Sequence, residues 1–147
     1  MSESEYLREA NYNEMIPLSG DVIIEQEKIN RCDAIVFIYP VFWTEAPAKL
    51  VGWFDRVWTF GFAYGNRTMK KLKEALVLCI AGHTIKHLKE YGHYESIKTV
   101  MLGDKMFDRA DCKELIILDG TSKSAPELRQ ANWKKHLTTA FETGKNL

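Results

Sequence analysis

Three short runs of apolar residues stand out along the chain, and none of them alternates with polar positions. They cover residues 33–39 (DAIVFIY), 75–81 (ALVLCIA) and 114–118 (ELIIL). An unbroken run of this length, rich in β-branched residues, is typical of a strand buried on both faces. Pro40 follows the first run and favours an extended backbone before it, so we predict strands here and not helices.

Helical spacing of apolar residues fills the intervals between these strands. Residues 1–20 show little periodicity and are expected to form an irregular amino-terminal segment. The alternation of helices and strands predicts an α/β fold, with one parallel sheet covered by helices on both faces, in a single domain over residues 1–147. The helices are predicted over residues 22–30, 47–58, 84–106 and 125–141.

This topology also predicts where a ligand would bind. Right-handed crossovers place the carboxyl ends of all three strands at one edge of the sheet. Ligands of open α/β sheets bind outside that edge. We therefore expect a functional site among the loops that follow the strands, at residues 40–47, 81–94 and 119–125.

Composition narrows the class of protein. The chain has 147 residues, 46% of them hydrophobic, with 20 basic and 20 acidic residues and no net charge. The hydrophobic content argues against intrinsic disorder, and the balance of basic and acidic residues argues against a nucleic-acid partner. The basic run at 67–73 is expected to be a solvated loop. No run approaches the roughly 18–20 apolar residues of a membrane span.

The cysteines and histidines suggest no metal or nucleophilic centre. Cys32, Cys79 and Cys112 are far apart and form no C-x-x-C pair, so we expect reduced thiols and a cytoplasmic location. His83 and His87 are spaced for one helical face, but no Glu or Cys stands at convincing ligand spacing. We expect no metal site. The alternative for His83, His87 and His93 is that they are surface residues of a polar loop without a chemical role.

The loop that leaves the first predicted strand carries the strongest candidate chemistry. Residues 39–43 read YPVFW, and the backbone amides and flat side chains of this segment could bracket a planar ring. The alternative is an aromatic plug that packs beneath the following helix. The residues alone leave both interpretations open.

A longer stretch that includes this loop resembles a known family. Residues 39–64 read YPVFWTEAPAKLVGWFDRVWTFGFAY. This resembles the signature of the flavodoxin-like NAD(P)H:quinone oxidoreductases of the DT-diaphorase and potassium-efflux ancillary type. Their pattern is Pro-x-x-Trp, then Pro-Ala-x-Leu-x-Gly-Trp-x-Asp-Arg-Val, then Gly-Phe-Ala-Tyr. More than a dozen positions match in order, and the resemblance covers roughly residues 20–141.

The resemblance implies a flavodoxin-like sheet, a bound FMN or FAD, and hydride transfer from NAD(P)H to a quinone-like acceptor. The loop after the first strand would hold one side of the flavin ring, through Pro40, Val41, Phe42 and Trp43. Amides of the next loop would contact the polar edge of the ring, through Ala81, Gly82, His83 and Thr84. The family usually has Thr-Thr-Gly-Gly there, so the hydroxyl contacts are lost. A neutral His93 or Tyr91 could protonate the departing hydroquinone oxygen.

Family members normally begin with a strand, a phosphate-binding loop, a helix and a second strand. This sequence has no room for these elements before its first match, so we expect a sheet truncated to about three strands. The strand at 34–39 would then lack its inner neighbour. A second copy of the chain could pair with it, residues 1–20 could fold over it, or the chain could be a remnant without tight flavin binding.

Three functional hypotheses follow from the resemblance. The leading one is a flavin-dependent oxidoreductase. The alternative is a flavin-poor regulatory or interaction subunit with the same scaffold, and a flavodoxin-like electron carrier is a third reading. A homodimer is expected under either of the first two. Its interface would draw on aromatic residues, namely Trp43, Trp53, Trp58, Phe60 and Phe62.

Overall fold

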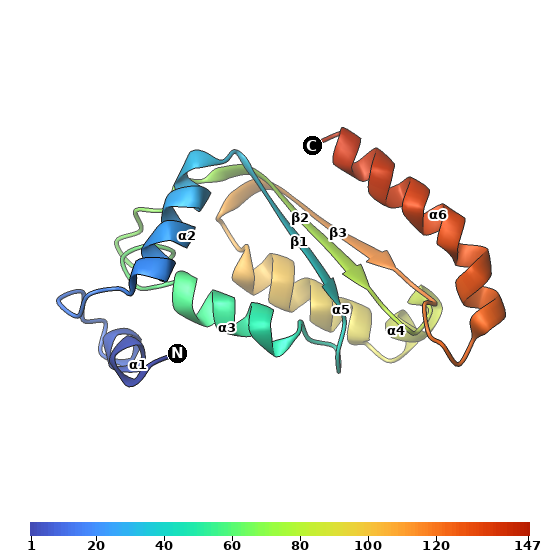
Figure 1. Ribbon diagram of the computed structural model, residues 1–147, viewed down its shortest axis with the longest axis horizontal. Coiled ribbons are helices and arrows are strands. Elements are labelled where there is room, and N and C mark those ends of the chain that lie inside the picture. Colours follow the sequence, from blue (N-terminus) through green and yellow to red (C-terminus); the bar gives the residue numbers. More distant parts are fainter.

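The computed structural model describes all residues from 1 to 147 and contains one parallel sheet of three strands. The strands are β1 (Ala34–Pro40), β2 (Leu72–Ile80) and β3 (Ala110–Leu118), in the order β1-β2-β3. Their carboxyl ends lie at the same edge (Figure 1). The three predicted strands and their parallel arrangement are confirmed, although β2 and β3 begin several residues earlier than the apolar runs suggested.

Helices lie on both sides of this sheet, as predicted. Figure 1 shows α3 and α5 on one side and α6 on the other. The long predicted helix at 84–106 is divided, because Gly92 at φ +75° separates two short helices. The elements are α1 (Glu3–Ala10), α2 (Gly20–Arg31), α3 (Ala48–Val57), α4 (Ile85–Glu90), α5 (His93–Lys98), the π-helical segment η1 (Thr99–Lys105) and α6 (Pro126–Lys145).

The hydrophobic core lies between the sheet and the helices α3, α5 and η1. Phe54 of α3, Val77 of the central strand and Ile97 of α5 are almost completely buried there. Cys79 is buried in the same core, and burial raises the pKa of its thiol to about 11. This matches the expectation of a reduced, structural thiol.

The prediction that β1 is buried on both faces is wrong. Phe37 and Tyr39 face the core, but Val36 is 39% exposed and Ile38 is 66% exposed. β1 stands at the edge of the sheet, and α6 covers the opposite face on the side of β3 (Figure 1). An apolar run shows that a strand can be buried, but it does not show whether a second layer covers that strand.

The expectation that residues 1–20 form an irregular segment is also wrong in part, because these residues contain α1. Ser2 and Glu5 form a capping box, in which Ser2 Oγ accepts from the Glu5 amide at 3.2 Å and the Ser2 amide donates to Glu5 Oε2 at 2.6 Å. α1 then docks on the segment after α3, where Arg8 donates to the Phe60 carbonyl at 3.2 Å. The segment does not pair with β1, whose only strand neighbour is β2.

Two of the five proposed interface aromatics belong to the core. Trp58 and Phe62 are buried, and the Trp58 indole nitrogen donates to the Lys105 carbonyl at 2.7 Å. Trp43, in contrast, is fully exposed. The basic run at 67–73 forms surface ion pairs, such as Lys70 with Asp33 at 2.5 Å. No helix has both the length and the apolar character needed to cross a membrane.

Candidate functional site

A cavity of about 540 Å³ opens at the carboxyl ends of β1 and β2, where the topology predicts a ligand site. This volume falls within the range of small-molecule pockets. The loop after β1, the loop after β2, and the helices α4 and α5 supply its walls. The lining residues are Val41, Trp43, Thr44, Ala81, Gly82, His83, Leu88 and His93.

The loop after β1 makes a tight two-residue turn that projects an indole. Phe42 and Glu45 exchange both backbone hydrogen bonds, each at 2.9 Å, around Trp43 and Thr44. Trp43 has φ +51° and Thr44 has φ +68°, the φ pattern of a type I′ turn. Such turns favour Asn and Gly, and each non-glycine residue in this region costs about 1–3 kcal/mol. The turn leaves the Trp43 side chain fully exposed at the cavity.

The loop after β2 is tied to the loop after β3. The Ala81 amide donates to the Leu118 carbonyl at 2.9 Å, and the Gly120 amide donates to the His83 carbonyl at 3.0 Å. The Ile85 amide donates to Asp119 Oδ2 at 2.8 Å and so anchors the start of α4. These bonds hold the backbone of residues 81–84 in place at the cavity wall.

Three consecutive amides of this loop make no hydrogen bond within the chain. They belong to Gly82, His83 and Thr84, whose neighbours on either side are all engaged. Backbone amides are strong donors, so three unused ones beside a cavity suit the acceptor edge of a flat heterocycle. The Ala81 amide is already bonded to β3 and cannot contribute to such a contact.

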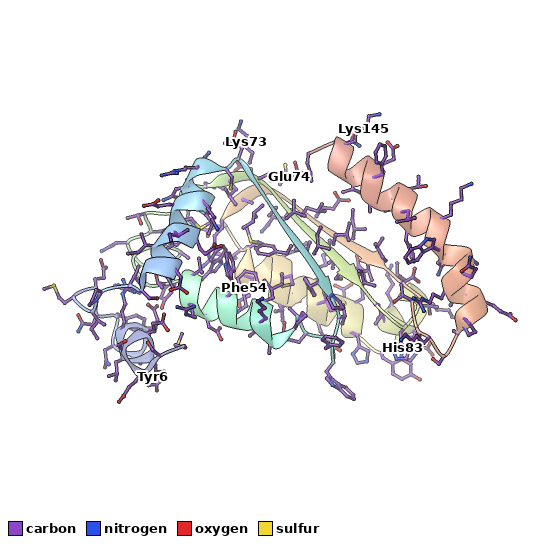
Figure 2. All side chains as sticks on the ribbon, in the orientation of Figure 1. Tyr6, Phe54, Lys73, Glu74, His83 and Lys145 are labelled. Atoms are coloured by element: carbon purple, nitrogen blue, oxygen red, sulfur yellow. The ribbon has the colours of Figure 1, made fainter.

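His83, His87 and Tyr91 form a stack of rings beside the cavity. His83 and His87 stack with centroids 4.1 Å apart and planes 14° apart, and Tyr91 continues the stack 4.5 Å from His87. Figure 2 labels His83 beside α4, close to the carboxyl ends of the strands. His83 and Tyr91 are exposed at the surface, and their rings stack on the half-buried His87.

His93 begins α5 and faces the loop after β1. Its Nδ1 lies 3.2 Å from the hydroxyl of Thr44, and its Nε2 has no hydrogen-bond partner in the chain. Tyr91 lies 6.3 Å away with its ring within 17° of parallel. Sequence reasoning missed Thr44 and Leu88 as lining residues. Nothing in the identity of Thr44 signals a left-handed conformation, whereas Leu88 stands out as the one buried residue of α4.

The remaining predicted site residues lie outside this cavity. Phe42 and Tyr91 are exposed and do not line it, and Thr84 caps α4 by accepting from the His87 amide at 3.3 Å. Pro40 lines a different depression. The structure thus brings together Val41, Trp43, Ala81, Gly82, His83 and His93.

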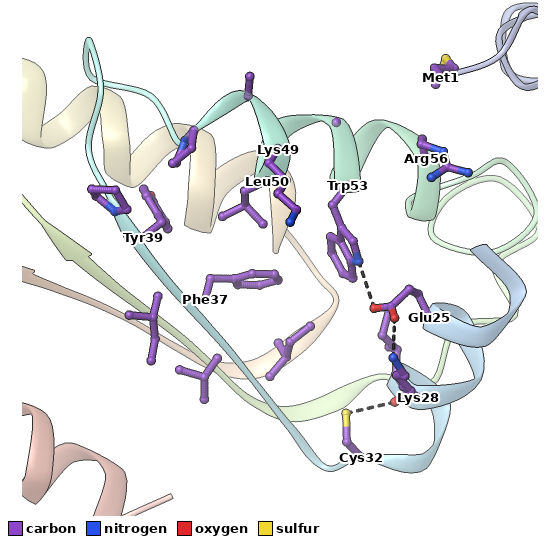
Figure 3. A pocket seen from close by; sticks show the side chains of 18 residues that line it. Met1, Glu25, Lys28, Cys32, Phe37, Tyr39, Lys49, Leu50, Trp53 and Arg56 are labelled. Carbon is purple, nitrogen blue, oxygen red and sulfur yellow. Dashed lines mark hydrogen bonds and ion pairs between the residues drawn. The ribbon is translucent and has the colours of Figure 1, made fainter. Parts of the chain in front are cut away.

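That second depression is an apolar groove of about 880 Å³ along β1 (Figure 3). Phe37 and Tyr39 of β1 face Leu50 and Trp53 of α3 across it. Burial raises the pKa of the Tyr39 phenol above its ordinary value. The groove offers mostly apolar surface, and its one carboxylate, Glu25, is paired with Lys28 at 2.5 Å. Nowhere in the structure do three His, Cys, Asp or Glu side chains gather in a way that would hold a metal ion.

Comparison with known proteins gives a consistent result. Residues 2–137 match the family model Flavodoxin_2, described as a flavodoxin-like fold. A solved NAD(P)H:quinone oxidoreductase from Methanothermobacter marburgensis is 43% identical, with a TM-score of 0.82 over 92% of this chain and 69% of that one.

Two further relatives extend the comparison. NAD(P)H dehydrogenase [quinone] 1 of Cavia porcellus is 28% identical over 137 residues, which cover 85% of this chain and 50% of that protein. The chain thus spans about half the length of this curated relative. General stress protein 14 from Treponema denticola, solved in complex with FMN, shares the fold at 24% identity and a TM-score of 0.57, over 90% of this chain and 76% of that one.

Proposed function

The chain belongs to the Flavodoxin_2 family, as its sequence resemblance predicted, and on this premise we propose that it is a flavin-dependent NAD(P)H oxidoreductase. The proposed reaction passes a hydride from a nicotinamide through a bound flavin to a quinone-like acceptor. One observation carries the proposal: Gly82 and His83, whose amides are unused, line the same cavity as an exposed indole, and the unused amide of Thr84 follows them in the chain.

The residues present fit the ring of a flavin. Val41 and Trp43 offer apolar surface to one side of the ring, with Pro40 and Phe42 next to them in the same loop. The amides of Gly82, His83 and Thr84 would donate to its polar edge. FMN and FAD share this ring, and the relative from Treponema denticola holds FMN. When bound, the flavin supplies the two-electron chemistry, and the protein supplies binding and orientation.

The protein's own chemical contribution would be a proton. Reduction of a quinone by hydride also consumes one proton, which a positioned side chain can deliver. His93 lines the cavity and is the first candidate donor, and Tyr91 lies beside it. We propose these two residues as the acid–base groups of the site.

Flavin binding is the direct test. The purified chain should turn yellow with FMN or FAD and then oxidise NADH or NADPH with a quinone. Trp43→Ala should weaken flavin binding about fivefold, since ring stacking is worth about 1 kcal/mol. Trp133→Ala is the control, because Trp133 is an exposed indole on α6 that does not line the cavity. A chain that stays colourless with excess of both flavins would contradict the proposal.

A second candidate function is that of a flavin-poor interaction or regulatory subunit. It is favoured by the apolar edge of β1, where Val36 and Ile38 are exposed, and by the groove beside it. A homodimer is compatible with either function. Colourless protein that self-associates through β1 would support this second candidate.

A further inference from the structure

Thr44 adopts a backbone conformation that its side chain disfavours. It is β-branched and has φ +68°, directly after Trp43 at φ +51°. Glycine would occupy this position of the turn without strain, whereas Thr costs about 1–3 kcal/mol. A glycine would lack the hydroxyl, which makes one contact in the structure, with His93 Nδ1 at 3.2 Å.

We propose that Thr44 is a positioning residue, whose hydroxyl holds His93 as the Nδ1–H tautomer so that Nε2 is the atom that exchanges a proton with the acceptor. This inference rests on the function proposed above. It adds a residue that the resemblance does not indicate, and it names the atom of His93 that acts.

The surroundings of the imidazole leave the opposite nitrogen available. Thr44 contacts Nδ1, while the rings of Tyr91 and His87 lie 6.3 and 6.5 Å from the His93 ring. Nε2 makes no hydrogen bond in the chain, and His93 lines the cavity. Because one ring nitrogen is engaged, the other is assigned to the ligand side.

The hydroxyl suits both protonation states of the ring. In the imidazolium both nitrogens carry protons, so Thr44 must accept from Nδ1–H. When the acceptor takes up a hydride at one site, the Nε2–H bond breaks and an O–H bond forms on the acceptor. The imidazolium becomes a neutral ring that keeps Nδ1–H and the same bond to Thr44. A proton from water then restores Nε2–H, so the contact needs no rearrangement during the cycle.

The proposal predicts a difference between variants at this one position. Thr44→Val removes the hydroxyl at nearly constant shape, and Thr44→Gly removes it while relieving the strain. In both, kcat for quinone reduction should fall roughly tenfold with KM little changed, because the substituted group acts on proton transfer and not on substrate binding. Thr44→Ser keeps the hydroxyl and should retain most of the activity.

The tautomer itself provides a readout independent of activity. Nitrogen-15 NMR of the side chains, with His93 assigned by loss of its signals in His93→Gln, should show Nδ1–H for neutral His93 in the parent chain and in Thr44→Ser. Thr44→Val and Thr44→Gly should lose that preference. Thr138→Val is the control, because the Thr138 hydroxyl bonds only to the Lys134 carbonyl in α6.

The outcomes separate this inference from the proposed function. If the parent chain binds no flavin, the function fails, yet the NMR comparison still decides the role of Thr44. If Thr44→Val and Thr44→Gly keep the Nδ1–H tautomer, or if Thr44→Ser loses it, the inference is overturned. Should Thr44→Val fold poorly, Thr44→Gly decides alone, since glycine is unstrained at this φ.

Discussion

Glu5 Oε1 lies 2.7 Å from Nη2 of Arg56, and this contact joins α1 to α3 across 51 residues of sequence. Arg56 also binds Asp21, at the start of α2, at 2.6 Å. The hydrogen bond from Arg56 is the main cause that lowers the pKa of the Glu5 carboxyl to about 2. One guanidinium therefore fastens three helices on the side of the molecule away from the candidate site.

We predict that this contact makes stability depend on pH in a defined window. The pKa of Glu5 falls from 4.5 to about 2 on folding, so its stabilisation is present above pH 4.5 and is lost as pH falls through 2. Glu5→Gln should cost about 1–2 kcal/mol at neutral pH and almost nothing at pH 2. Urea unfolding across this range measures the effect.

A matched control is available within the same turn of helix. Glu3 is exposed and forms no ion pair, so Glu3→Gln should leave the pH dependence of the parent chain unchanged. Equal pH profiles for the parent chain and Glu5→Gln would show that Arg56 does not stabilise the folded state through Glu5.

Gly120 supports the candidate site from the neighbouring loop. It has φ +62°, and a Cβ there would lie 2.8 Å from Asn132 Nδ2 and 3.0 Å from Leu128 Cδ2. We predict that Gly120→Ala destabilises the protein by about 1–3 kcal/mol. Because the Gly120 amide also donates to the His83 carbonyl, the substitution should weaken flavin binding as well.

The urea midpoint and the flavin dissociation constant measure the two effects of Gly120→Ala. Gly144→Ala is the control, since Gly144 lies in α6 with open space around its Cβ position and should gain up to ~1 kcal/mol. If Gly120→Ala unfolds at the same urea concentration as the parent chain, the left-handed requirement at this turn is refuted.

How much of this structure the sequence could predict depends on how local each feature is. The apolar runs predicted the strands, because a short, unbroken apolar run is typical of a buried strand. The alternation of strands with helices then predicted a parallel sheet, and so predicted that the loops after the strands lie at one edge. The start of α1 is also encoded locally, because Ser2 and Glu5 have the spacing of a capping box, a signal that is independent of apolar periodicity. The exposure of Ile38 could not be predicted from the sequence. Whether a helix covers that face of β1 depends on the tertiary arrangement, and the local sequence pattern of the strand does not indicate it.

Within the candidate site, too, the sequence predicted local features but not contacts between distant parts of the chain. The resemblance indicated Trp43 and the loop at 81–84, and Trp43 lines one cavity together with residues 81–83. The contact between Thr44 and His93 joins the loop after β1 to the start of α5, 49 residues further along the chain, so no local spacing rule predicts it. His83 lies before the N-cap of α4, so its stacking on His87 depends on the path of the loop after β2 and not on helical spacing. The free amides of this loop likewise depend on the hydrogen bonds of the whole fold.

Cysteine reactivity offers a test of the core. Burial raises the pKa of the Cys79 thiol to about 11, whereas Cys112 is exposed on β3. The thiolate is the reactive form, so at pH 8 Cys79 should react with iodoacetamide far more slowly than Cys112. Mass spectrometry of the native protein should show Cys112 labelled first, and Cys112→Ser should remove this fast phase. Rapid labelling of Cys79 in folded protein would contradict its placement in the core.

The free edge of β1 leads to a prediction about assembly. The Val41 amide donates to the Ile80 carbonyl and the Asp33 carbonyl accepts from Lys73, so the odd-numbered residues face β2. In a parallel ladder the alternate residues face the other way. The amides directed to the free edge are therefore those of Ala34, Val36 and Ile38.

No charged residue interrupts residues 34–40, although natural edge strands are commonly protected by charges, bulges or short length. An antiparallel contact centred on Val36 would set Ala34 of one copy opposite Ile38 of the other, and every free amide would find a carbonyl. We predict that the chain self-associates through this edge, as a dimer whose sheet is continuous.

Ile38→Lys tests this assembly without disturbing the monomer, because the side chain is largely exposed. Sedimentation at micromolar concentration should show a dimer for the parent chain and at least tenfold weaker association for Ile38→Lys. Ile24→Lys places the same charge on an exposed position of α2 and should leave the dimer intact. A monomeric parent chain would refute the edge contact, and equal weakening by both substitutions would mean that added charge, and not its place on β1, disrupts the dimer.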